Sequence, residues 1–257
     1  MILADRNVRR LSYKLDSDIT SMVADNIINY ELTRIESNAP MSTLEIETEQ
    51  WVHDCCFIIT SQPVLRIRLK PENNYPKITA YLRFRTPLSS IVMAGTGSIQ
   101  TNNLMQSDNL VFELSGTGKA KLNLEIFTQL EVIVSGTGVI ELIGRVKGTT
   151  YVRLTGSGEF DGRMCPADRV IVDVTGVGTA YVVGEQAVDI GIGGVGNVYY
   201  HGPLRNQRVN GFGSIHQLTS SNGGEWNRST INKSSNYFYF LVFIHIFVSF
   251  SRENKFH

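Results

Sequence analysis

The feature that most constrains this chain is the tripeptide Gly-x-Gly, which recurs at a nearly constant spacing. The first glycines of seven copies are 21, 20, 20, 20, 18 and 17 residues apart, and none of the 23 glycines precedes the first copy. Seven copies at this spacing indicate an internal repeat. The paired glycines are Gly95, Gly97, Gly116, Gly118, Gly136, Gly138, Gly156, Gly158, Gly176, Gly178, Gly194, Gly196, Gly211 and Gly213.

Apolar and polar residues alternate on both sides of each pair. Leu130, Val132 and Val134 precede the third pair, and Ile140 and Leu142 follow it. A period of two with β-branched residues is typical of strands with one buried face. About 20 residues per repeat is too short for a four-stranded propeller blade, and the leucine-rich pattern is absent.

The repeat therefore predicts an all-β fold, a parallel β-helix or solenoid with one coil of about 20 residues per copy. In such a fold the glycines allow backbone angles that other residues disfavour, or a tight bend at a corner. The alternative is an antiparallel meander of hairpins with the tripeptide in its turns. A meander gives no reason for one tripeptide to keep the same offset seven times.

The composition divides the chain into four parts. Residues 1–42 form an N-terminal segment, in which Ile19, Val23, Ile27 and Ile35, with Ser17 as a cap, predict a short amphipathic helix. Residues 43–218 form the β-helix domain, whose irregular first coils cap its exposed edge. Residues 219–236 are a polar linker, and residues 237–257 are an apolar tail.

The tail contains the apolar run 237–250. As a helix this run spans about 21 Å, short of the roughly 30 Å hydrocarbon core of a bilayer. Weak membrane association, an anchor-attachment signal and a non-native tail all remain open. Asn227 and Asn232 fit the N-glycosylation pattern, while no signal peptide is visible at the start of this chain.

Charge and cysteine content exclude several kinds of partner. Twenty-four basic residues balance 24 acidic ones, so no basic field is present to attract nucleic acid. The three cysteines show neither metal-ligand spacing nor a disulfide framework, and adjacent Cys55 and Cys56 are expected to be thiols in a strand. The pairs lack the third glycine and the helix of a dinucleotide site. We expect no cofactor and no metal.

In-register stacking predicts a surface ladder from the residue five positions after each first glycine. Its members are Lys121, Glu141, Asp161, Tyr181 and Tyr199. Glu141 and Asp161 on neighbouring coils are candidates for glycoside hydrolysis, but no cleft is indicated, and Lys121 can offset an acidic pair. Exposed stacked tyrosines are suited to contact a sugar or a protein.

Three stretches resemble one known family, the putative auto-transporter adhesin, head GIN domain family. These are Leu-Glu-Val-Ile-Val-Ser-Gly-Thr-Gly-Val-Ile at 130–140 with its copies, Thr-Pro-Leu-Ser-Ser-Ile at 86–91, and Tyr-Tyr-His-Gly-Pro at 199–203. The resemblance covers about residues 43–218. It implies a right-handed β-helix exported to the cell surface or periplasm, and it brings no catalytic residues. The chain departs from the family in its lack of an export signal and in its apolar tail.

We therefore expect a non-enzymatic, adhesin-like module, extracellular or attached to the cell surface, that binds a glycan or a surface protein. A self-assembling structural solenoid is the second hypothesis. A polysaccharide-active enzyme that uses Glu141 and Asp161 is the third.

Overall fold

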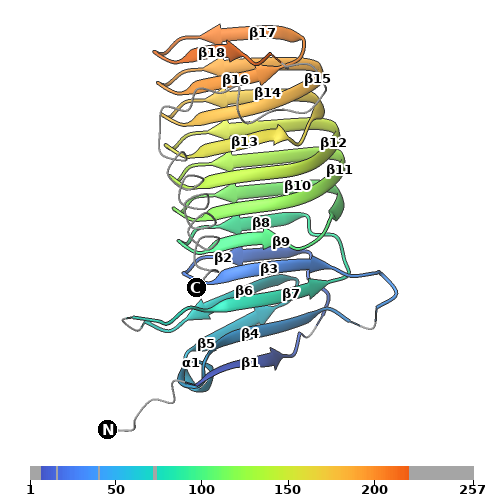
Figure 1. The fold of residues 1–257 in the computed structure, drawn as a ribbon, viewed down its shortest axis with the longest axis vertical. Helices are drawn as coiled ribbons and strands as arrows, with labels where there is room; N and C mark the ends of the chain where they lie inside the picture. The colour runs from blue at the N-terminus through green and yellow to red at the C-terminus, as the bar shows by residue number, and fades with distance from the viewer. Residues whose placement is uncertain (1–6, 16, 40, 72–73, 220–257) are drawn as a thin grey trace, which may run out of the picture. The chain divides into compact units, whose positions relative to one another are not determined.

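The alternating segments of the repeat form strands that stack as successive coils (Figure 1). The computed structural model describes residues 7–15, 17–39, 41–71 and 74–219, and the folded unit ends at Leu218. It is a β-solenoid of about six turns, which confirms the fold predicted from the repeat. The coils pair in parallel, so the antiparallel meander is excluded for the glycine-containing part.

Eighteen strands and one helix make up the described chain. They are β1 (Val8–Tyr13), β2 (Ser21–Ala24), β3 (Asn29–Arg34), β4 (Thr43–Glu49), α1 (Gln50–Cys55), β5 (Phe57–Ser61), β6 (Val64–Leu69), β7 (Thr79–Phe84), β8 (Ser90–Met93), β9 (Ser98–Thr101), β10 (Met105–Leu114), β11 (Lys119–Val134), β12 (Val139–Leu154), β13 (Glu159–Met164), β14 (Ala167–Val174), β15 (Thr179–Ile192), β16 (Asn197–His201), β17 (Leu204–Val209) and β18 (Ser214–Gln217).

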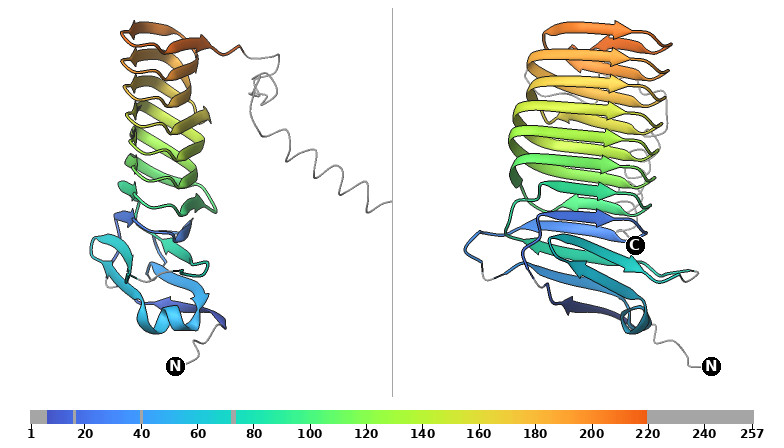
Figure 2. Two further views of the ribbon diagram at one scale, coloured as in Figure 1. Left: turned by 90° about the vertical axis from the view of Figure 1, so that its left-hand side faces the viewer. Right: turned by 180° about the vertical axis from the view of Figure 1, so that it is seen from behind.

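Each coil contributes one strand to each of two facing layers. The first layer holds β3, β9, β13, β16, β18 and the first halves of β11, β12 and β15. The second layer holds β2, β8, β10, β14, β17 and the second halves of the same long strands. The Gly-x-Gly turn joins the layers at one edge, and the long strands bend across the other (Figure 2).

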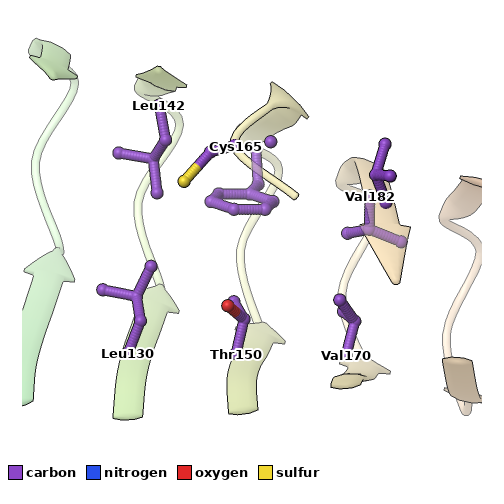
Figure 3. Close-up of a pocket in the computed structure, with 9 residues that line it drawn as sticks. Leu130, Leu142, Thr150, Cys165, Val170 and Val182 are labelled. Atoms are coloured by element: carbon purple, nitrogen blue, oxygen red, sulfur yellow. The ribbon is translucent and has the colours of Figure 1, made fainter. Parts of the chain in front are cut away.

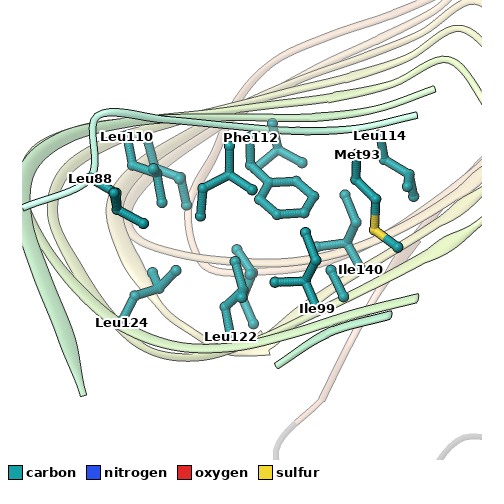
Figure 4. Packing of buried hydrophobic residues seen from close by; sticks show 14 of the residues in the cluster. Leu88, Met93, Ile99, Leu110, Phe112, Leu114, Leu122, Leu124 and Ile140 are labelled. Carbon is teal, nitrogen blue, oxygen red and sulfur yellow. The ribbon is translucent and has the colours of Figure 1, made fainter. Parts of the chain in front are cut away.

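The core lies between the two layers. Leu122, Leu124 and Ile140 of the first layer face Leu110 and Phe112 of the second (Figure 4). All five side chains are buried. In-register pairing places equivalent apolar residues above one another, so burial of each coil depends on its neighbours.

The beginning of the chain forms a coil rather than the expected helix. Strand β2 lies between β6 and β8, and β3 lies between β7 and β9. The burial of Met22 and Tyr30 follows a two-residue period, whereas Ile27, placed on the apolar face of the expected helix, is 42% exposed. The helix prediction for residues 1–42 was therefore wrong, and coil stacking begins before residue 43.

Antiparallel strands cap the N-terminal end of the stack. Strand β4 pairs antiparallel with β7, β1 with β4, and β5 with β6. Helix α1 occupies the region where a strand containing Cys55 and Cys56 was expected. Its end places the two sulfur atoms side by side, and they form a disulfide, so the prediction of two thiols was wrong.

The tripeptide turns stack directly on one another. The amide of Thr137 donates a hydrogen bond to the carbonyl of Gly116 at 3.1 Å, and equivalent bonds join the other turns. A Cβ on Gly116 would lie 2.0 Å from the carbonyl oxygen of Gly95. Among the described glycines only Gly144 and Gly202 have positive φ. The paired glycines are therefore needed because neighbouring coils approach closely at the turns, and not because the backbone there is left-handed.

No helix among the described residues has the length and apolar character needed to cross a membrane. The predicted linker and tail, apart from Thr219, lie outside the described residues, as do Asn227 and Asn232.

Candidate functional site

The predicted ladder is a continuous column on the outer face of the first layer. Lys121 pairs in register with Glu141, Glu141 with Asp161, Asp161 with Tyr181, and Tyr181 with Tyr199. The residues on either side of these positions, such as Leu122 and Ala120, are buried in the core. Strand alternation therefore turns the column outward.

The column extends one coil further at each end. Gln100 pairs with Lys121, and His216 pairs with Tyr199. Both lie five residues after the first glycine of their pair, so the rule that predicted the ladder also finds them.

The lower half of the column is charged. Lys121 Nζ lies 3.1 Å from Glu141 Oε1. Asp161 accepts hydrogen bonds from Arg163, including one from Nε at 2.8 Å. The ion pair with Asp161 raises the pKa of the Arg163 guanidinium through its hydrogen bonds, although burial opposes this effect.

The upper half is a stack of four planar groups. The ring centroids of Tyr181 and Tyr199 are 4.8 Å apart, and those of Tyr199 and His216 are 4.9 Å apart, both stacked. Arg163 Cζ lies 4.5 Å from the centroid of Tyr181. Arg163, Tyr181, Tyr199 and His216 are called the aromatic stack below.

Stacking changes what the tyrosines present to a ligand. Both faces of Tyr181 and of Tyr199 are covered by neighbours in the stack, and Tyr181 is only 7% exposed. Burial raises the pKa of Tyr181, and the nearby charge of Glu159 adds to this effect while Arg163 opposes it. The expectation of an exposed Tyr181 was wrong, because Arg163, two residues beyond Asp161, folds over its ring.

His216 is the exposed end of the aromatic stack. Its outer face meets no other ring among the described residues, and its Nε2 lies 2.9 Å from Ser214 Oγ. The surface offered to a ligand is therefore the face of His216 together with the edge of Tyr199.

The two carboxylates proposed for hydrolysis do not form a catalytic pair in a cleft. Glu141 contacts Lys121 and Asp161 contacts Arg163, both on the outer face of a regular sheet. The described residues enclose a cavity of about 10 Å³ between the layers, lined by Leu130, Leu142, Thr150, Cys165 and Val170 among others (Figure 3). This volume is about that of one water, so it cannot hold a sugar.

Other titratable groups do not gather into a site within the described part of the chain. No cluster of three or more His, Cys, Asp or Glu side chains there could hold a metal ion. Cys165 lies in the core, where burial raises the pKa of its thiol to about 12. Such a thiol is not a nucleophile at neutral pH.

Comparison with known proteins agrees with this architecture. A crystal structure of a putative adhesin from Bacteroides fragilis has a TM-score of 0.75 and 21% identity, over 83% of this chain and 98% of that one. A putative adhesin from Parabacteroides distasonis has a TM-score of 0.64 and 20% identity, over 84% and 98%. A protein described as a putative lipid binding protein, also from P. distasonis, has a TM-score of 0.66 and 17% identity, over 84% and 98%.

These identities establish a shared fold alone. A search of curated proteins found no match. Residues 26–203, well over half of the chain, match the family described as "Putative auto-transporter adhesin, head GIN domain". The match begins within the coil formed by β2 and β3, in agreement with the structural start of the stack. The chain therefore belongs to the putative auto-transporter adhesin, head GIN domain family.

Proposed function

We propose that this domain is a non-enzymatic, adhesin-like module that binds a glycan or a protein at the exposed end of the aromatic stack. The observation that carries the proposal is the stacking of Tyr181, Tyr199 and His216 in register on the outer face of the first layer. Arg163 packs on the ring of Tyr181, and Tyr181 packs on the ring of Tyr199. The side chains of Tyr199 and His216 therefore lose little conformational freedom when a ligand binds.

The chemistry of this end suits a ligand with both apolar and hydrogen-bonding groups. The face of His216 can pack against a sugar ring or an aromatic side chain. The partly exposed hydroxyl of Ser214 beside it can take part in hydrogen bonds with a ligand. Family membership supports a surface or extracellular role, and we place the binding event there.

The test compares His216→Ala and Tyr199→Ala with Tyr151→Ala. Tyr151 is a tyrosine on the outer face of the second layer, 39% exposed, so it controls for the loss of a surface ring. Binding of purified protein to a glycan array and to intact cells is measured after circular dichroism has shown that each variant is folded. We expect at least a tenfold loss for His216→Ala and Tyr199→Ala, and no loss for Tyr151→Ala. Equal binding by all three variants would reject this surface.

The surface location has its own measurement. Protease added to intact cells should digest the protein without permeabilisation. Protection until the cells are permeabilised would exclude adhesion and favour an internal scaffold.

The two other functions have less support. For an enzyme that uses Glu141 and Asp161, each carboxylate is already held in an ion pair, with Lys121 and with Arg163 respectively. End-to-end assembly would have to continue the core, yet the terminal coil places Gln207 and Gln217 opposite the inward-facing Ile190 and Tyr200. Polar residues at these positions are typical of a terminal repeat that faces water.

A further inference from the structure

The last Gly-x-Gly turn begins with the only asparagine–glycine pair among the described residues, Asn210 and Gly211. In the earlier coils the position of Asn210 is taken by small or hydroxyl-bearing residues, namely Ala94, Ser115, Ser135, Thr155, Thr175 and Gly193. The turn therefore does not require asparagine. An asparagine side chain can close a five-membered ring with the next backbone nitrogen, and glycine favours this because it has no side chain to obstruct the approach.

The side chain of Asn210 lies against Arg208 at the end of β17, and both residues are exposed. With the amide oriented to accept, its oxygen lies 3.0 Å from Arg208 Nε and 3.1 Å from Arg208 Nη2. One edge of the guanidinium thus donates two hydrogen bonds to a single carbonyl oxygen. Two charged donors draw electron density from the amide carbon Cγ. They also stabilise the negative charge that forms on the oxygen when a nucleophile adds to that carbon.

The backbone nitrogen of Gly211 is the nucleophile within reach along the chain. Its amide donates to the carbonyl of Ile192 at 3.3 Å, and the amide of Asn210 donates to the same carbonyl at 2.8 Å. The longer bond is the weaker one, and its loss leaves the carbonyl of Ile192 satisfied by Asn210. Strands β17 and β18 end the described stack, and Phe212 beside this nitrogen is 93% exposed, so water reaches the turn (Figure 1).

We propose that Asn210 is a site of spontaneous modification, at which the folded terminal turn converts asparagine to isoaspartate and aspartate with Arg208 as the promoting group. The nitrogen of Gly211 loses its proton to hydroxide and forms a bond to Asn210 Cγ. The negative charge passes to Oδ1, beside the guanidinium. The bond from Cγ to Nδ2 then breaks, and Nδ2 takes a proton from water and leaves as ammonia. The product is a five-membered succinimide ring.

Water opens this ring at one of its two carbonyl carbons. Attack at Cγ gives aspartate and restores the ordinary backbone. Attack at the main-chain carbonyl carbon of residue 210 leaves the chain running through Cγ, which is isoaspartate. In both products ammonia has been exchanged for water and one carboxylate has formed. The reaction therefore needs no oxidant, metal or cofactor.

The modification changes the end of the solenoid. Isoaspartate lengthens the backbone of the turn by one carbon atom and places a carboxylate beside Arg208. The turn is held to the coil below by a hydrogen bond from the amide of Phe212 to the carbonyl of Gly194 at 2.9 Å, and it leads into β18, which carries His216. The added carbon shifts the register of these contacts as the protein ages. The chemistry needs no ligand, so this proposal does not rest on the proposed function.

Peptide mapping of the aged full chain tests the proposal. The purified protein is kept at mildly alkaline pH and digested under acidic conditions, which stop the reaction. Mass spectrometry then locates each conversion, and an isoaspartyl methyltransferase with a labelled methyl donor counts isoaspartate. We expect conversion at Asn210 and none over the same time at Asn206, which lies on β17 and is followed by Gln207.

Asn222, which is followed by Gly223, is a chemical reference within the same molecule. Conversion at Asn222 shows that the conditions support the reaction. An unchanged Asn210 beside a converted Asn222 would overturn the proposal, because it would mean that the folded turn protects the pair.

Substitution tests the role of Arg208. Arg208→Gln should slow conversion at Asn210 by at least about fivefold and leave the rate at Asn222 unchanged. Arg205→Gln removes another exposed arginine from the same strand and should change neither rate. Arg208→Lys keeps the charge but cannot direct two parallel donors at one oxygen, so it should also slow the reaction. Circular dichroism first shows that each variant is folded.

Urea separates the folded turn from the local sequence. In the full chain unfolded by urea the guanidinium is no longer held on the amide oxygen, so Arg208→Gln should have no effect on the rate at Asn210. Equal rates for wild type and Arg208→Gln in the folded chain would overturn the proposal. The same slowing in folded and unfolded chains would also overturn it, because the effect would then come from the sequence alone.

Discussion

A Cβ atom on Gly136 would lie 2.0 Å from the carbonyl oxygen of Gly116 in the turn below. The obstacle is backbone that itself belongs to a stacked turn, so it cannot move aside as the end of a side chain can. We therefore expect Gly136→Ala to lower the free energy of unfolding by about 1–3 kcal/mol, measured by chemical denaturation.

Gly193 is the matched control for this substitution. A Cβ there meets no atom closer than Thr175 Cγ2 at 3.7 Å, and its φ is not positive. Gly193→Ala should leave stability unchanged or raise it slightly, because alanine has fewer unfolded conformations to lose. Equal losses of stability in Gly136→Ala and Gly193→Ala would show that close approach between stacked turns is not the reason for glycine at position 136.

Thr150 is a polar residue in an apolar column. It pairs in register with Leu130 and Val170, it is 4% exposed, and its hydroxyl oxygen has no hydrogen-bond partner among the described residues. Thr150→Val keeps the shape of the side chain and removes the unsatisfied hydroxyl. The free energy of unfolding, measured by thermal unfolding, should therefore rise by about 1 kcal/mol. A loss instead would mean that a water in the adjoining cavity satisfies the hydroxyl.

Asn26 holds the turn between β2 and β3 without a glycine. Its Oδ1 accepts a hydrogen bond from the amide of Ile28 at 3.0 Å, and its Nδ2 donates to the carbonyl of Ile67. Asn26→Ala should reduce stability by about 1–2 kcal/mol in a denaturant titration. Asn109→Ala, at an exposed position, serves as the control, and a loss no larger than the control's would contradict this role.

The ion pair of Asp189 should make the stability of the protein depend on pH in the acid range. Burial alone raises the pKa of Asp189, but hydrogen bonds from Arg169 and Asn206 outweigh burial and lower it below the ordinary value. A lowered folded-state pKa contributes stability above about pH 4, and this contribution is lost as the pH falls through the folded pKa. Asp189→Asn should therefore be less stable than wild type at pH 7, and the difference should narrow below pH 4.

The control for Asp189 is Asp108→Asn, at an exposed position. Its stability should follow that of the wild type across the same pH range. A constant difference between Asp189→Asn and wild type from pH 7 to pH 3 would exclude the ion pair as the cause.

The coils after Gly95 could be predicted from the sequence because each has the same physical requirement. A turn stacked on a tight turn needs glycine, and strand alternation then fixes which side chains form columns. The ladder from Lys121 to Tyr199 follows from this rule, and so do Gln100 and His216.

The first coil could not be found in this way. Asn26 and Ile28 occupy the positions that Gly95 and Gly97 occupy one coil above, and a Cβ on each of those glycines would meet Asn26 or Ile28 backbone. Below the β2–β3 turn, β6 and β7 are joined by the longer connection 70–78 instead of a tight turn, so side chains are tolerated. Without glycines this coil has no repeat signature.

The burial of Tyr181 depends on a residue outside the column. Arg163 is bound by Asp161 on its own strand and reaches the ring of Tyr181 on the next coil. Offsets within the repeat describe the backbone register, but they do not say where a long side chain folds. Sequence reasoning therefore located the column and misjudged which of its members a ligand can reach.

The placement of β2 and β3 inside the stack has a consequence for synthesis of the protein. Tyr30 pairs with Ala80 on one side and with Ile99 on the other, 50 and 69 residues later in the chain. Both neighbours are synthesised after Tyr30, so β3 must wait for them before it is held in place. Each later coil finds its partner about 20 residues earlier and can be added as soon as it emerges. Assembly thus begins with one slow, non-local step and continues as ordered growth toward the C-terminus.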